Sequence, residues 1–258
     1  MKITKFCKKI AANLLVLTSF LLLGSPVLAQ DDLAFEQDVS AAIDDGLQYL
    51  RDQLVYTGGD IYSSQAQARG IALLALLEKR ASADPDAAIL GYANSSPADQ
   101  ALAREAVRLI LENTYRYGVA GTTWYAYSAG SNMMAISLYA RTGGPEVANF
   151  PGLKLSTAID RLFDLTVAVQ TNSVSINDGF CGYYVARDDS STTQFAVAGL
   201  AAAKGFYLEL GDPGARLSAI DAALALSAAG YAANQRADGG FGYRATYYNS
   251  SYQQTASA

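Results

Sequence analysis

Four aspartates are the residues of this chain whose types and spacing could support catalysis. Asp178 and Asp238 occupy equivalent places in two copies of one sequence pattern, and two further acids follow the first of them. Two carboxylates that face each other across a cavity can act as the acid and the base or nucleophile of glycoside hydrolysis. The chain contains no histidine, which excludes a Ser-His-Asp triad or a papain-like Cys-His pair within it. The catalytic candidates are Asp178, Asp238, Asp188 and Asp189.

Each of these acids also has a simple structural explanation. Asp178 and Asp238 both precede glycine, and an Asp-Gly pair favours a tight turn. Asp188 and Asp189 precede an apolar helix, whose N-terminus attracts negative charge. Because position alone accounts for all four acids, the turn and cap interpretation is favoured over catalysis, and the sequence leans against an enzyme.

Aromatic residues gather in the glycine-containing loops around these acids. Rings at the mouth of a cavity can stack on sugar rings or line an apolar ligand pocket. In the alternative interpretation the rings fill the loop ends of the fold, and this alternative is favoured because a buried tyrosine near a turn usually finds a backbone partner. The candidates for a ligand-binding rim are Trp124, Tyr125, Phe180, Tyr183, Phe241 and Tyr243.

Helices must position these loops, and their apolar patterns are of two kinds. One kind has a single apolar face, and the other is apolar on all sides, which is typical of helices buried all round. The two kinds alternate along the chain and predict an all-α fold with two concentric layers. The one-faced helices are expected at 39–54, 97–113, 155–170 and 213–235. The apolar helices are expected at 64–79, 131–141 and 192–210, with an eighth helix beginning near Ser251.

Two local signals mark helix ends. Ser96-Pro97-Ala98-Asp99 is typical of an N-cap, a first-turn proline and an acid at the third position. Gly143-Gly144-Pro145 is typical of a helix stop. These signals predict a helix beginning at Pro97 and another ending just before Gly143.

The pattern from Asp178 to Ala196 returns from Asp238 to Ala256 and aligns there without a gap. Eight positions find the same residue sixty positions later: Asp178, Gly179, Gly182, Tyr183, Ser190, Ser191, Gln194 and Ala196. Shared turn and cap residues at one period indicate a repeat architecture. Loop glycines at a similar spacing, Gly58, Gly121, Gly179 and Gly240, predict about four repeats.

These stretches resemble the repeats of the prenyltransferase and squalene-cyclase superfamily. The resemblance rests on Asp178-Gly-Phe, on Asp-Asp-Ser-Ser-Thr-Thr-Gln-Phe-Ala before residue 197, and on Asn234-Gln-Arg-Ala-Asp-Gly-Gly-Phe-Gly-Tyr243. The family places a glutamine at the end of each outer helix, and Gln53, Asn113, Gln170 and Gln235 stand at those positions. The resemblance implies an α/α toroid of helical hairpins, about six in a closed barrel. Four repeats therefore imply an incomplete barrel, and we expect the natural chain to continue beyond Ala258.

The family's catalytic motifs are not carried over. Its cyclases use an Asp-x-Asp-Asp acid, and Arg187-Asp188-Asp189-Ser190 lacks the first aspartate. Its protein prenyltransferases bind zinc through Asp, Cys and His, but the spacing of Asp178 and Cys181 is unsuitable and Cys181 aligns with Phe241. We expect no metal and no cofactor. The resemblance favours a non-catalytic toroid that binds a small ligand, a glycan or a protein. The alternatives are a carbohydrate-active toroid with paired rim carboxylates and a degenerate or fragmentary terpene cyclase-like enzyme.

The first 29 residues have the pattern of a signal peptide. Four lysines precede a short apolar run, and cleavage is expected between Ala29 and Gln30. Residues 30–38 form an acidic lead-in, and residues 39–258 form the repeat domain. Removing the leader takes away four lysines and no acid, leaving 15 Lys and Arg against 24 Asp and Glu, a net charge of −9. The sequence therefore predicts a secreted or periplasmic protein that does not span a membrane and has no nucleic-acid partner.

Overall fold

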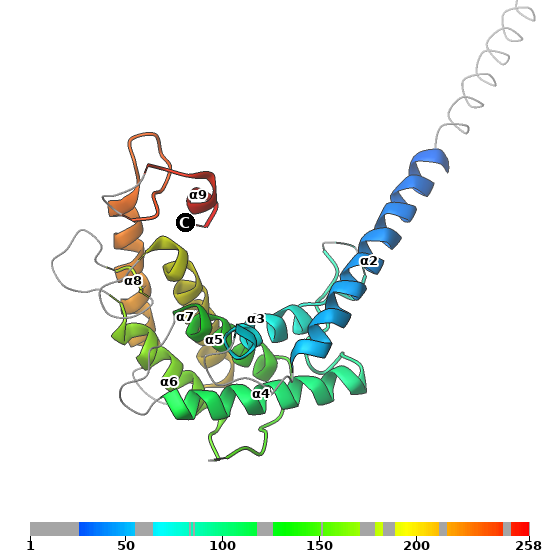
Figure 1. The fold of residues 1–258 in the computed structure, drawn as a ribbon, viewed down its shortest axis with the longest axis horizontal. Coiled ribbons are helices and arrows are strands. Elements are labelled where there is room, and N and C mark those ends of the chain that lie inside the picture. Colours follow the sequence, from blue (N-terminus) through cyan, green and yellow to red (C-terminus); the bar gives the residue numbers. More distant parts are fainter. Residues whose placement is uncertain are drawn as a thin grey trace, which may run out of the picture. The chain divides into compact units, whose positions relative to one another are not determined.

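In the part of the chain that the structure describes, all regular elements are helices. The structure is a computed structural model that describes residues 26–54, 64–82, 84, 86–117, 126–150, 152–170, 179–182, 189–211, 216–244 and 249–257. Its helices are α2 (Pro26–Leu54), α3 (Ser64–Leu77), α4 (Pro97–Tyr117), α5 (Ala126–Arg141), α6 (Leu155–Ala168), α7 (Ser190–Leu210), α8 (Arg216–Asn234) and α9 (Tyr252–Ser257) (Figure 1). The all-α prediction is confirmed.

The chain divides into two compact units, one formed by residues 1–46 with 80–87 and the other by 47–79 with 88–258. In the first unit, the described side chains of α2 up to Gly46 are exposed or half-buried, and the guanidinium of Arg80 donates to the carbonyl oxygen of Ala87 at 2.6 Å. The second unit contains the main hydrophobic core, which begins at Leu47. The residues and cavities considered as candidate functional sites lie in this second unit.

The helices of the second unit form two rows by their contacts, here called the inner row (α3, α5, α7 and α9) and the outer row (α4, α6 and α8). Helix α5 packs between α3 and α7, and α9 packs against α7. Helices α4, α6 and α8 pack on the outer side of this row, α4 and α6 against each other and α8 against α7. Eleven of the sixteen residues of α5 are buried, against five of the nineteen residues of α8. Helices α6 and α7 do not differ in this way, since six of fourteen and nine of twenty-one residues are buried.

Several helix bounds differ from the predicted ones. Helix α2 begins at Pro26 rather than Val39, because the helix continues through the acidic segment instead of leaving it as a separate lead-in; the side chains from Ala34 to Asp38 are exposed. Helix α5 begins at Ala126 rather than Ser131, and α4 continues to Tyr117 rather than ending near Asn113. The expected start of α8 at Pro213 lies outside the described residues.

The predicted stop and cap signals act as expected. The amide of Gly144 donates to the carbonyl oxygen of Tyr139 at 2.8 Å, and Gly143 has a φ of 91°, which is the geometry of a glycine-terminated helix. At the start of α4, the hydroxyl of Ser96 accepts the amide of Asp99 at 3.1 Å. Local capping chemistry therefore sets both of these helix ends.

Glycines allow the inner helices to approach closely. A Cβ atom placed on Gly130 of α5 would lie 2.0 Å from the carbonyl oxygen of Phe195, and one on Gly199 of α7 would lie 2.6 Å from the Cα atom of Gly130. A Cβ on Gly70 of α3 would lie 2.7 Å from the backbone nitrogen of Asn132. Real Cβ atoms do not approach other atoms this closely, so the inner row depends on glycine at its crossings.

Asp99 gives the protein a pH-dependent contribution to stability. The guanidinium of Arg51 donates to both of its carboxylate oxygens, at 2.7 and 3.1 Å. These hydrogen bonds hold the pKa of Asp99 below its ordinary value, with further help from Ser96. Because the folded pKa is lower than the unfolded one, the stabilisation is present above the ordinary value of about 3.9. It is lost as the pH falls through the lower folded value.

We therefore expect Asp99→Asn to lower the free energy of unfolding at neutral pH by about 0.5 kcal/mol, the typical contribution of a partly exposed ion pair. The difference between the variant and the parent should vanish as the pH falls from about 5 to about 2. Urea unfolding across this pH series measures it, with Asp45→Asn on α2 as an exposed acid control. A difference that stays constant over the whole series would contradict the ion-pair explanation.

Candidate functional site

Asp189 is the buried N-cap of α7. Its side chain is 0% exposed. One carboxylate oxygen accepts the amide of Thr192 at 2.8 Å and the hydroxyl of Thr192 at 3.0 Å, and the other accepts the hydroxyl of Tyr243. Asp189 therefore caps α7 as predicted, and its second hydrogen-bond partner is Tyr243, one of the rim candidates.

Asp238 shapes an exposed turn. One carboxylate oxygen accepts the amide of Gly240 at 3.0 Å, and the other accepts the hydroxyl of Ser250. These two hydrogen bonds, that of Ser250 first, lower the pKa of Asp238. Gly239 between them has a φ of 83°, which explains why a glycine follows the aspartate. The other two acidic candidates, Asp178 and Asp188, lie outside the described residues.

The two described acids are thus engaged in folding. A general acid or a nucleophile must face its substrate, with its proton or lone pair directed at the reacting atoms. Both oxygens of Asp189 instead hold hydrogen bonds inside the protein, and both oxygens of Asp238 close the turn. In this conformation, neither of these two carboxylates is placed to act in the glycoside hydrolysis that the sequence analysis considered.

The described rim aromatics pack around a tyrosine that the sequence analysis did not single out. Phe180 is 0% exposed, and its ring centroid lies 5.1 Å from that of Tyr231. The ring of Phe241 lies edge-on to that of Tyr231 with centroids 6.0 Å apart, while the hydroxyl of Tyr243 donates to Asp189. Trp124, Tyr125 and Tyr183 lie outside the described residues.

Tyr231 also ties α8 to the start of α7. Its hydroxyl donates to the carbonyl oxygen of Ser190 at 3.0 Å, and burial raises the pKa of the phenol. The half-buried residue lies four positions after Ser227, next to the buried stripe of α8. That helical spacing is the sequence signal that could have identified it. Among the described residues, Phe180 and Phe241 flank Tyr231, so these rings fill the loop ends of the fold.

Two glutamines have the same role in consecutive repeats. The side-chain amide of Gln170 donates to the carbonyl oxygens of Gly179 at 3.3 Å and Ala223 at 2.8 Å, and to the hydroxyl of Ser227 at 2.8 Å. The side-chain amide of Gln235 donates to the carbonyl oxygen of Gly239 at 3.0 Å. Each glutamine thereby holds the glycine loop that follows its own helix.

Gln170, which is buried, is expected to contribute more to the free energy of unfolding than Gln235, which is exposed. Gln170→Leu would remove these buried hydrogen bonds and leave the carbonyl oxygen of Gly179 with the hydroxyl of Ser227 as its donor, and we expect it to lower the free energy of unfolding by about 2–3 kcal/mol. Gln235→Leu is the matched control, because Gln235 is exposed and water can replace its hydrogen bond, so a loss of about 0.5–1 kcal/mol is expected. Urea unfolding of both variants compares them, and equal losses would contradict this role of Gln170.

The repeat register in space differs from the gapless alignment of the sequence. The ends of the glycine loops match at sixty residues, since Gln170 forms a bridge with Cys181 and Gln235 forms one with Phe241, although the two glutamines themselves are sixty-five residues apart. The following helices do not match at sixty residues. The amide of Asp189 donates to the carbonyl oxygen of Cys181, and the equivalent donor to Phe241 is the amide of Ser251.

The capping contacts show the same shift. The amide of Thr192 donates to the side chain of Asp189, and the amide of Gln254 donates to the hydroxyl of Ser251 at 3.2 Å. The last repeat therefore contains two more residues between its glycine loop and its helix cap. The gapless prediction is wrong there, because hydrogen bonding to the loop, and not residue identity, selects the cap.

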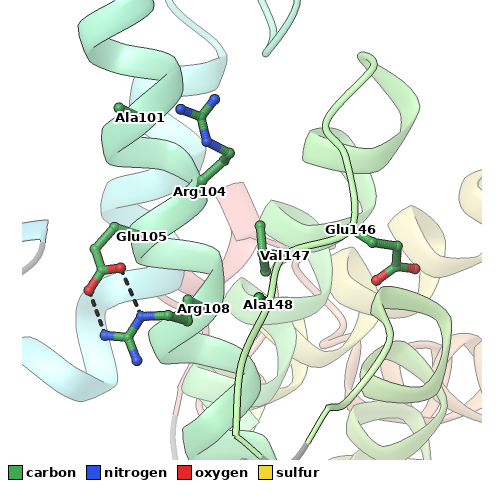
Figure 2. Close-up of a pocket in the computed structure, with 7 residues that line it drawn as sticks. All are labelled: Ala101, Arg104, Glu105, Arg108, Glu146, Val147 and Ala148. Atoms are coloured by element: carbon green, nitrogen blue, oxygen red, sulfur yellow. Dashed lines mark hydrogen bonds and ion pairs between the residues drawn. The ribbon is translucent and has the colours of Figure 1, made fainter.

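A groove that the sequence did not predict lies between α4 and the segment that joins α5 to α6 (Figure 2). Its volume is about 320 Å³. Four lining residues are charged and three are small and apolar: Ala101, Arg104, Glu105, Arg108, Glu146, Val147 and Ala148. Figure 2 shows the four residues from α4 on one wall and the other three on the facing wall.

A second cavity, of about 220 Å³, lies where the end of α2 meets α3. Gln53, the first of the glutamines noted in the sequence, lines it together with the buried Arg69. The guanidinium of Arg69 donates to the carbonyl oxygen of Leu54 at 3.0 Å and so satisfies the C-terminal end of α2. One residue that lines this cavity, Arg69, therefore has a structural role at the end of α2.

The chain matches no protein-family model, no curated protein and no solved structure. Within the residues that the structure describes, no helix combines the length and the apolar character needed to cross a membrane. That same part of the chain holds no group of three or more Cys, Asp or Glu residues placed to share a metal ion. The interpretation of function below therefore rests on the geometry and on the sequence alone.

Proposed function

We propose that this protein is an exported, non-catalytic member of the prenyltransferase and squalene-cyclase repeat superfamily, and that its α/α toroid binds a ligand or a protein partner. The two-row alternation of helices supports the toroid. The equivalent contacts of Gln170 and Gln235 with their glycine loops support the repeat. The signal-peptide pattern before Gln30 supports export.

One observation carries the non-catalytic part of this proposal: the described acidic candidates hold turns and caps. Asp189 is fully buried among Thr192 and Tyr243, and Asp238 is bonded to Gly240 and Ser250. The carbohydrate-active alternative requires two carboxylates directed at a substrate. Neither of these two aspartates meets that requirement, so binding is the better supported role.

Thermal-shift screening of the exported protein tests the binding role. A ligand that binds only the folded state raises the unfolding temperature according to its concentration and affinity. We expect a saturable shift with one member of a panel of soluble glycans, isoprenoids and candidate protein partners, without turnover of that compound. A screen with no shift from any member would count against a ligand-binding role.

The non-catalytic part has its own test. If the exported protein cleaved a glycan, and if Asp238→Asn abolished cleavage while the exposed control Asp221→Asn did not, the proposal would be overturned. Circular dichroism and thermal unfolding of both variants would establish that the loss is not a loss of fold. Unchanged inactivity towards glycans in all three proteins is the expected result.

A further inference from the structure

Helix α2 carries an apolar stripe that is exposed in the first compact unit. Phe35, Val39 and Ile43 are spaced four residues apart, which places them on one face of the helix. Phe35 is 69% exposed and Ile43 is 46% exposed, while Val39 is half-buried. The stripe begins after the expected cleavage site between Ala29 and Gln30, so the exported chain keeps it.

The same helical register is used for packing further along α2. Leu47 and Leu54 are buried and belong to the main core, and Leu50 is half-buried against it. One face of α2 thus has the apolar spacing that suits contact with other helices. The protein's own core covers the C-terminal part of this face, whereas the part from Phe35 to Ile43 is open to solvent.

Acidic side chains border the exposed stripe on both sides. At about 100° of rotation per residue, Glu36 lies on one side of the stripe, and Asp38 and Asp45 lie on the other. All three side chains are exposed. The sequence has no lysine or arginine between residues 26 and 50. Both borders of the apolar stripe are therefore negative.

This charge selects among the possible occupants of the stripe. A second copy of the chain would bring the same acids to both borders, and like charges beside an apolar helix seam oppose pairing. Amphipathic helices that lie on membranes carry lysine and arginine on their polar face, and anionic lipids attract such basic segments. Exposed apolar patches with polar borders are typical of protein interaction sites. The charge pattern therefore favours a helix whose own borders are basic.

We propose that the face of α2 formed by Phe35, Val39 and Ile43 binds a basic amphipathic helix of a partner protein. The partner's apolar side chains would pack on this stripe, and its lysines or arginines would pair with the bordering acids, among them Glu36 and Asp38. This inference goes beyond the proposed function, since it assigns a protein partner to α2 and depends neither on the repeat superfamily nor on the rim.

Fluorescence anisotropy with synthetic peptides tests the inference on the exported chain. The probe is a labelled helical peptide with leucines on one face and lysines on both borders of that face. One control peptide has glutamates in place of the lysines, and a second has the composition of the probe in scrambled order. We expect saturable binding of the probe at low ionic strength and at least tenfold weaker binding of both controls, because each control lacks either the charge or the apolar face.

The two control peptides separate the parts of the proposal. Binding of the scrambled peptide as tight as that of the probe would reduce the interaction to net charge and overturn the docking face. Equally tight binding of the glutamate peptide would overturn the selection of a basic partner. An absence of saturable binding of the probe would overturn the site itself.

Variants locate the binding on the stripe. Phe35→Gln and Ile43→Gln should each weaken binding of the probe at least tenfold. Ala41→Gln is the matched control, because Ala41 is exposed on the opposite face of the same helix. Circular dichroism and thermal unfolding check that each variant is folded. Unchanged affinity in either stripe variant would overturn the assignment.

The other two occupants have measurements of their own. Sedimentation velocity of the exported chain tests for a second copy, and a dimer that Ile43→Gln dissociates would overturn the proposal. Co-sedimentation with vesicles of phosphatidylcholine and phosphatidylglycerol tests for a membrane surface, and binding that Phe35→Gln abolishes would also overturn it. We expect neither, because the borders of the stripe repel a second copy and an anionic bilayer alike.

Discussion

Replacing Gly130 by alanine is expected to lower the free energy of unfolding by about 3 kcal/mol. The added methyl group would lie 2.0 Å from the carbonyl oxygen of Phe195, which belongs to the backbone of α7 and cannot rotate away. Helices α5 and α7 would have to move apart along the inner row, which α5 forms with α3 and α7. The loss should appear even though alanine favours the helical state more than glycine does.

Gly46→Ala provides the matched control for this substitution. Gly46 also lies inside a helix, but a Cβ atom there would meet nothing within 4 Å. Alanine at this position should therefore stabilise the helix by about 0.5–1 kcal/mol, the ordinary difference in helix propensity. Urea unfolding of the two variants separates packing from propensity. If Gly130→Ala were as stable as the parent, the close crossing of α5 and α7 would be disproved.

Asp189→Ala is expected to have the second large effect, a loss of about 3 kcal/mol. An N-cap residue typically contributes about 1 kcal/mol. Here the substitution would also remove the hydrogen bonds that the carboxylate accepts from the hydroxyls of Thr192 and Tyr243, and a hydrogen bond to a charged group contributes about 1.5–3 kcal/mol. The carboxylate is fully buried, so water cannot readily replace it.

Ser251→Ala is the control for the cap alone. Ser251 caps α9 by accepting the amide of Gln254, and it is half-buried. We expect this variant to lose about 1 kcal/mol, clearly less than Asp189→Ala. Asp189→Asn should recover part of the loss, because the amide oxygen can still accept the amide of Thr192. Thermal and urea unfolding compare the three variants, and equal losses for Ser251→Ala and Asp189→Ala would refute the buried network.

These experiments also bear on function. A structural Asp189 predicts loss of stability as the first consequence of substitution, whereas a catalytic Asp189 predicts loss of activity in a protein of unchanged stability. Active-site residues are often replaced without loss of stability, because their environment is arranged for chemistry at a cost to folding. The stability of Asp189→Asn therefore provides independent evidence on the non-catalytic proposal.

The all-helical fold and most of the helices could be predicted from the sequence because they depend on neighbours along the chain. Ser96 and Pro97 mark the start of α4 through hydrogen bonds that span three residues, and Gly143 ends α5 by its own φ of 91°. The period of apolar residues separates a helix buried on most sides from one buried on a single stripe. Turn and cap roles for Asp238 and Asp189 followed from the same local chemistry.

Tertiary structure alone decided which of these residues meet. Tyr231 lies between Phe180 and Phe241 because α8 packs beside α7, and Gly130 faces Gly199 because α5 crosses α7. Arg104 and Glu146 line the same groove from segments about forty residues apart in the sequence. Such contacts depend on how complete helices pack, and a single chain carries no local signal for them. The sequence by itself determined the elements and their caps, while packing determined the neighbours that give each side chain its role.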